Sequence, residues 1–199
     1  MKKGRLHFSV LFLLPVFFVL SALGQNPCPK SGSATTQKQK QLNVAKNKSV
    51  TVSSSMTPRF MLLDSMISGT KQEDKDWFTV GDYIVTEGFL INAIEEGPES
   101  CNCGNADAKL KTGDVHMYLG LTKTAKPKDC VIIEITPAFK KKFSSYENFL
   151  TPKKKIRVTG FLLYDFIHRR DAKMTCTNCG KAWRNNCWEI HPITKIEVL

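Results

Sequence analysis

The sequence lacks the short motifs by which several common enzyme classes are recognised. It contains no Gly-x-Ser-x-Gly nucleophile elbow, no glycine-rich phosphate loop and no His-Glu-x-x-His helix. Histidine is also scarce, with only 4 in the 199-residue chain. The absence of these motifs argues against the α/β-hydrolase, P-loop and zinc metalloprotease classes.

Long apolar runs are missing after the first 24 residues. Before that point, a basic start over Met1–Arg5 precedes the apolar run Phe8–Leu20, and small residues follow up to Gly24. The run contains Pro15 and is too short to cross a bilayer comfortably. We therefore predict a signal peptide over 1–24, no transmembrane segment after its removal, and a secreted or periplasmic protein. An uncleaved N-terminal anchor is the alternative.

Acidic residues are the scarcer charge, because 18 Asp and Glu stand against 29 Lys and Arg, a formal net charge of +11. An excess of positive charge favours an anionic partner, such as an anionic polymer or the cell envelope. Nucleic acid is less favoured, because the lysine runs at 140–142 and 153–155 flank a predicted helix and do not alternate with exposed aromatic residues. The plainer interpretation is a solvated, lysine-rich surface.

Apolar residues are few between residues 25 and 56, where Ser, Thr, Gln, Lys and Asn dominate. Such a segment buries too little surface to offset the entropy cost of ordering it, so we predict a disordered tether over 25–56. The first apolar cluster follows, and it predicts a short helix and linker over 57–76. The compact domain is predicted over 77–199.

Five segments of the compact domain have the composition and alternation of β-strands. A helix is predicted between the third and fourth of them, because Thr136 and Pro137 form a helix start and aromatic residues recur at helical spacing. This order predicts a mainly β fold, a five-stranded OB-fold-like Greek-key barrel. A five-stranded sandwich with an added helix is the alternative. The predicted strands are 82–95, 114–122, 130–136, 155–166 and 186–199.

Side-chain alternation sorts the polar residues of three strands onto one surface. When apolar residues fill the barrel, Asp114, His116, Glu134, Glu189 and His191 face outward. The third strand of an OB-fold lies between the second and the fifth, so we predict that these side chains share one exposed face. Carboxylates with imidazoles suit a divalent metal or acid–base chemistry. No lysine or arginine is expected among them, which argues against phosphate binding.

The predicted metal ligands on this face are Asp114, His116, Glu189 and His191, with zinc as a candidate ion. Glu134 and Glu189 are the candidate catalytic carboxylates, and Glu134 is either a base or a further ligand. The plainer interpretation is that all of these are solvated residues on the outside of a barrel. His191, which precedes a proline, would then bond only a backbone carbonyl.

Two cysteine hairpins lie in loops that flank the same surface of an OB-fold. They are Cys101-x-Cys103, between the first two strands, and Cys176-x-x-Cys179, between the last two. Four thiolates from two such hairpins would make a tetrahedral zinc site. In an oxidising compartment disulfides compete with zinc, and free or redox-active thiols are a third alternative.

The chain has 7 cysteines, an odd number, which leaves one thiol unpaired or paired outside the chain. A disulfide between Cys130 and Cys187, across neighbouring strands, is one prediction. Cys28 lies alone in the predicted tether, so it is the predicted odd thiol.

Several strings in the compact domain occur together: ESCNCGN, DVHMYL, CVIIEITPAF, RVTGFLLYD and WEIHPIT. In this combination the region from about Gly81 to Leu199 resembles a family of small secreted bacterial proteins. The resemblance implies an exported protein with an OB-fold-like barrel, and it implies no activity. Cys176-x-x-Cys179 is an addition to the family pattern.

Three functions follow as hypotheses. The first is an exported OB-fold-like binding module whose ligand lies on the polar face of the second, third and fifth strands. The second is a metal-dependent hydrolase, with phosphodiesters as the substrate class. The third is a structural envelope protein without a ligand.

Overall fold

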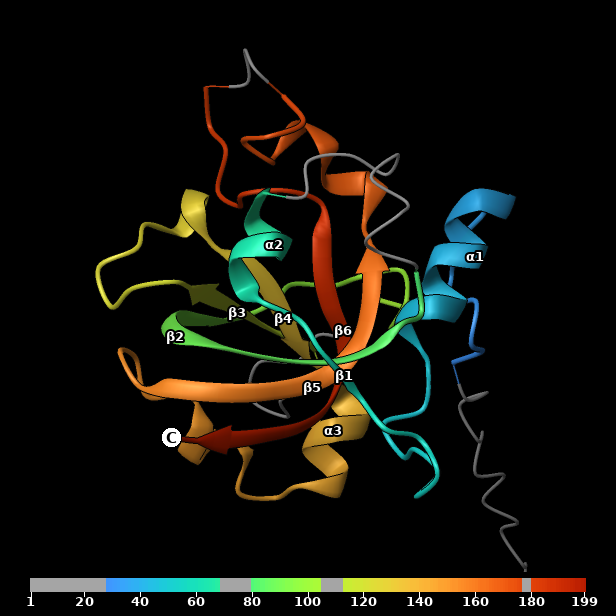
Figure 1. Ribbon diagram of the computed structural model, residues 1–199. Coiled ribbons are helices and arrows are strands. Elements are labelled where there is room, and N and C mark those ends of the chain that lie inside the picture. The colour runs from blue at the N-terminus through green and yellow to red at the C-terminus, as the bar shows by residue number, and fades with distance from the viewer. Residues whose placement is uncertain (1–27, 69–79, 105–112, 177–179) are drawn as a thin grey trace, which may run out of the picture.

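A computed structural model of the chain describes residues 28–68, 80–104, 113–176 and 180–199 (Figure 1). The predicted signal peptide over 1–24 lies outside these ranges. None of the helices within them combines the length and the apolar character that crossing a membrane requires. The helices are α1 (Gln37–Lys46), α2 (Leu63–Ser68) and α3 (Pro137–Lys142), with 3-10 turns at Pro127–Asp129, Tyr146–Phe149 and Phe166–Arg170. The strands are β1 (Arg59–Phe60), β2 (Tyr83–Glu95), β3 (Val115–Gly120), β4 (Val131–Ile135), β5 (Lys155–Tyr164) and β6 (Trp188–Val198).

The strands form one sheet in the order β1-β2-β3-β4-β6-β5, and β2 also pairs with β5. That last pairing closes β2 to β6 into a five-stranded barrel, with β1 added to β2 as a short parallel strand. β4 lies between β3 and β6, and its pairing with β6 is parallel. The predicted OB-fold-like barrel and the predicted strand neighbours are therefore confirmed.

Apolar side chains from all five barrel strands fill one core, which includes Leu90, Met117, Ile133, Val158 and Ile190. Each is fully buried, and burying such a side chain stabilises the fold by about 1.5–3 kcal/mol. The predicted helix between the third and fourth strands is α3. It begins after Thr136, whose hydroxyl accepts a hydrogen bond from the amide of Phe139.

A glycine allows β5 and β6 to approach each other where the barrel bends. A Cβ at Gly160 would lie 2.5 Å from Cγ2 of Ile190 and 2.6 Å from the carbonyl oxygen of Pro192. The β5–β6 register shifts on both sides of Gly160, between Thr159 and Leu162. A bulge there strengthens the coiling that a small closed barrel needs.

The segment predicted as a disordered tether over 25–56 contains an ordered helix in the structure. α1 lies beside the barrel (Figure 1), and its Leu42 and Asn43 are buried. Side-chain amides hold it: Asn43 Nδ2 donates to the carbonyl of Ser31 at 2.9 Å, and Asn47 Nδ2 donates to the carbonyl of Cys101 at 2.8 Å. The composition argument was wrong for this stretch because polar contacts, and not an apolar stripe, order it.

A disulfide between Cys28 and Cys103 ties the start of this segment to the loop after β2. The prediction that Cys28 is the odd thiol is therefore wrong. The next segment, predicted as a short helix and linker over 57–76, contains β1 and α2, and its residues 69–76 lie outside the described ranges.

Candidate functional site

The structure brings together the five polar residues that side-chain alternation placed on one face. His116 on β3 lies opposite Glu134 on β4, and the Nε2 of His116 contacts a Glu134 carboxylate oxygen. On the other side of Glu134, the Nδ1 of His191 on β6 contacts its second oxygen. Glu134 is thus bracketed by two imidazoles. We call Asp114, His116, Glu134, Glu189 and His191 the polar cluster.

The polar cluster is buried, whereas the sequence predicted an exposed face. Its side chains are at most 3% exposed. Two cations that the sequence did not place here contact the cluster: Lys46 at the end of α1, and Arg184 in the segment before β6. The expectation that no lysine or arginine lies among these residues is therefore wrong. α1 and the 183–186 segment add tertiary contacts that strand parity alone cannot reveal.

Lys46 lies at the centre of three carboxylates. Its Nζ is 3.2 Å from Oε1 of Glu99, 3.3 Å from Oδ2 of Asp165 and 3.9 Å from Oε2 of Glu134. Burial opposes the ammonium charge, but these carboxylates together with Glu189 outweigh it and hold the pKa of Lys46 well above its usual range. Lys46 is therefore a fixed cation of the interior.

Arg184 and Glu189 form a fully buried ion pair. Nη2 of Arg184 lies 2.9 Å from Oε2 of Glu189, and its Nε donates to the carbonyl of Asn186 at 2.8 Å. Burial, followed by the charges of Glu134 and Asp165, raises the pKa of Glu189 to about 7, although Arg184 opposes this rise. Arg184 is thus paired with Glu189, the carboxylate that the sequence predicted for metal binding or catalysis.

The environment of Glu134 separates it from an ordinary buried acid. Burial alone would raise its pKa, but His116, Lys46 and His191 outweigh burial and hold the pKa well below the usual range. Burial likewise disfavours the charged form of His116. Glu134 and Glu96 outweigh that effect and raise the pKa of His116 to about 10.

Three members of the polar cluster offer ligand atoms that all lie within 4.8 Å of one another: Asp114, Glu134 and His191. Glu99, Cys101 and Asp114 form a second such group. Of the metal ligands predicted from sequence, Asp114 and His191 belong to the first group. His116 contacts Glu96 and Glu134, and Glu189 contacts Arg184. The ligand roles, and the catalytic roles of Glu134 and Glu189, stay predictions.

The predicted four-thiolate zinc site is wrong for the cysteines that the structure describes. Cys103 is bonded to Cys28, Cys176 is also disulfide-bonded, and Cys101 is a buried free thiol. Two of the four sulfurs are thus already in disulfides, which confirms that alternative for Cys103 and Cys176. Cys179 lies outside the described residues.

The predicted Cys130–Cys187 disulfide is also wrong, because both thiols are free. They point to different surroundings: Cys130 packs in a small cluster with Tyr118 and Ile132, whereas Cys187 belongs to the main core. The thiol of Cys130 donates to the carbonyl of Lys126 at 3.2 Å.

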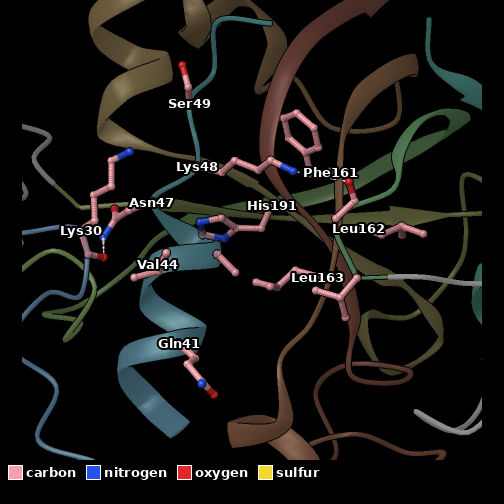
Figure 2. A pocket seen from close by; sticks show the side chains of 13 residues that line it. Lys30, Gln41, Val44, Asn47, Lys48, Ser49, Phe161, Leu162, Leu163 and His191 are labelled. Atoms are coloured by element: carbon pink, nitrogen blue, oxygen red, sulfur yellow. Dashed lines mark hydrogen bonds between the residues drawn. The ribbon is translucent and has the colours of Figure 1, made fainter. Parts of the chain in front are cut away.

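A pocket of about 550 Å³ opens between α1 and the β5–β6 pair, and His191 is the member of the polar cluster that lines it (Figure 2). Lys48 contributes a cation to this pocket. Its Nζ lies 3.8 Å from the centroid of the Phe161 ring and 3.5 Å from the carbonyl oxygen of Gly81. Burial lowers the pKa of Lys48. The apolar lining residues are Val44, Ala45, Val80, Phe161, Leu162 and Leu163.

Sequence reasoning missed Lys46, Glu99, Asp165 and the lining role of α1. Lys46 is one of many lysines in a polar stretch, and no local pattern separates it from its solvated neighbours. Arg184 had a weak signal, since it stands beside Trp183 directly before an apolar strand. Neither residue lies on a strand that alternation could assign to a face.

No protein-family model and no curated protein matches the chain. Among solved structures, OBody AM3L15 bound to hen egg-white lysozyme is 10% identical, with 60% of this chain and 82% of that chain covered and a TM-score of 0.37. OBody AM3L09, also bound to hen egg-white lysozyme, is 11% identical, with 60% and 83% covered and a TM-score of 0.36. No functional argument follows from likenesses this distant. The resemblance to a family of small secreted bacterial proteins stays a prediction.

Proposed function

We propose that this protein is an exported binding module that takes a small anionic ligand with an apolar body in the pocket between α1 and the β5–β6 pair. The observation that supports this proposal most directly is the positive charge of the pocket lining. Two lysines, Lys30 and Lys48, are among the described residues that line it, and none of those residues is acidic. Of the residues on the polar face predicted from the sequence, His191 alone is among the described residues that line this pocket.

The size and lining of the pocket support this proposal. Small-molecule sites are commonly clefts of about 300–1,000 Å³ with mostly apolar walls and a few placed polar groups. Here Val44, Leu162 and Leu163 offer apolar wall, and Lys48 is held against the face of Phe161 (Figure 2). An anionic head group would take the ammonium of Lys48 as a partner, while the apolar body would lie along the leucines.

Decanoate and decan-1-ol test the proposal, because they share an alkyl chain and differ in charge. We expect decanoate to bind more tightly, measured by isothermal titration calorimetry. Lys48→Met should weaken decanoate binding about tenfold or more, since a hydrogen bond to a charged group contributes roughly 1.5–3 kcal/mol, and should leave decanol binding nearly unchanged.

The matched control is Lys141→Met, which removes an exposed lysine of α3 that does not line the pocket. It should change neither affinity. Equal binding of decanol and decanoate, or an equal loss in the two variants, would contradict a charge-selective pocket.

A metal-dependent hydrolase remains the second candidate, because the group formed by Asp114, Glu134 and His191 lies directly behind the pocket wall. Glu134 is fully buried between two imidazoles, so of these three side chains His191 is the one placed to meet a substrate. This arrangement favours binding over hydrolysis as the leading proposal.

A further inference from the structure

The acidic interior behind His191 has more carboxylates than fixed cations. Two permanent cations, Lys46 and Arg184, and the two imidazoles of His116 and His191 face six carboxylates in the described part of this region. Buried charges are costly unless they are paired, so the remaining negative charge requires protons or a further cation. The carboxylates are Glu96, Glu99, Asp114, Glu134, Asp165 and Glu189.

Asp114 makes no ion pair with either of these fixed cations. Its Oδ1 accepts a hydrogen bond from Nδ2 of Asn102 at 3.1 Å, and its Oδ2 lies 3.9 Å from Nε2 of His191. The Lys46 ion pairs go to Glu99, Asp165 and Glu134, and not to Asp114. Asp114 is only 1% exposed, so water does not offset its charge.

One oxygen of this group has no hydrogen-bond partner. Oδ2 of Asp114 is buried and makes no hydrogen bond, since His191 lies 3.9 Å away. Glu134, which is in direct contact with His191, offers a further ligand atom beside it. An orphaned buried carboxylate oxygen that faces a carboxylate and an imidazole is what a bound ion would satisfy.

We propose that Asp114, Glu134 and His191 form a binding site for one divalent transition-metal ion of the zinc class. Their ligand atoms lie within 4.8 Å of one another, and the tetrahedral spacing around zinc is about 3.4 Å, which small side-chain rotations reach. Two carboxylate oxygens and one imidazole nitrogen leave a fourth position open. The mixed donor set favours zinc over magnesium or calcium, which prefer oxygen ligands alone.

The three ligands come from three separate places in the barrel, before β3, on β4 and on β6, so the closed sheet fixes their relative positions. The pocket gives an ion a route, because His191 lines it. This inference does not rest on the proposed function, since zinc alone tests it without any organic ligand.

The test uses the secreted protein with its disulfides formed, stripped with a chelator and titrated with ZnCl₂ in competition with a chromophoric chelator. We expect one zinc per chain. Asp114→Asn and His191→Gln should each weaken binding by about a hundredfold or more, because each removes one of three protein ligands. Near-ultraviolet circular dichroism checks that the variants fold.

Two control variants separate this site from its neighbours. His168→Gln removes a described histidine that has acidic neighbours but lies outside the proposed ligand set, since His168 contacts Asp165 and Asp171. Cys101→Ser removes the thiol of the second candidate group. Both should retain zinc affinity. A loss in either control, or unchanged binding in both ligand variants, would overturn the proposed ligand set.

Cobalt binding to the unmodified chain gives an answer that does not depend on variant folding. Bound Co²⁺ should broaden the NMR ring signals of His191 more than those of His168, which is not one of the proposed ligands. It should show no thiolate charge-transfer band. Absence of stoichiometric binding, a thiolate band, or selective broadening of His168 would each overturn the proposal.

Discussion

At the scale of single residues, the buried ion pair of Arg184 and Glu189 shows that each buried charge needs its partner. Both side chains are 0% exposed, and the guanidinium also donates to a backbone carbonyl. Removing both charges from water is expensive, and the pair offsets that cost only while both partners are present. Losing one partner therefore matters far more than losing the pair.

This asymmetry gives a measurable prediction. Arg184→Met should lower the free energy of unfolding by about 3–5 kcal/mol, because it leaves Glu189 buried beside Glu134 without its cation. The double variant Arg184→Met/Glu189→Met should recover most of that loss. Urea denaturation of the three proteins, with the exposed Lys195→Met as control, measures both effects. A double variant as unstable as the single one would show that the pair is not the cause.

At the scale of elements, α1 is held to the barrel by polar contacts and by a covalent bond. Ser100 and Cys101, in the loop after β2, receive hydrogen bonds from Asn43 and Asn47, and the Cys28–Cys103 disulfide fixes the chain just before α1. α1 in turn supplies Lys46 to the interior and one wall of the pocket. The helix is thus a component of the site and not a tether.

The disulfide closes a long loop, because its two cysteines have a sequence separation of 75. Chain-entropy arguments give such a bridge about 4 kcal/mol of stabilisation, mainly through the unfolded state. We expect Cys28→Ser/Cys103→Ser to lose stability of that order in urea denaturation. Its α1 amides should also exchange hydrogen faster than the amides of β4. An α1 that stays as protected as β4 would show that the noncovalent contacts suffice.

The barrel strands and α3 were predictable because their apolar residues repeat with the period of a strand or a helix. The convergence of His116, Glu134 and His191 was predictable for the same reason, since parity and strand order place them on one side. α1 was not predictable, because its packing depends on individual amides and on Lys46. The burial of the polar cluster followed from α1 and was missed with it.

At the scale of the whole molecule, the free thiols report how cooperatively the barrel opens. Among the described cysteines, Cys101, Cys130 and Cys187 are free and buried. Burial raises the pKa of Cys130 to about 12, and it raises the pKa values of the other two as well. A protonated, buried thiol is a poor nucleophile, so none of the three should react in the native state.

We therefore expect 5,5′-dithiobis(2-nitrobenzoic acid) to label essentially no thiol in the folded protein and all three in guanidinium chloride. Cys130 and Cys187 flank barrel strands, so they should become reactive together, at the rate of global opening. Cys101 lies in the loop that the disulfide and α1 cover, so opening of α1 alone should expose it. Peptide mapping of the labelled chain over time separates the three. Labelling of Cys130 before Cys101 would contradict this order, because it would place the weakest part of the molecule in the barrel and not in the helix that covers it.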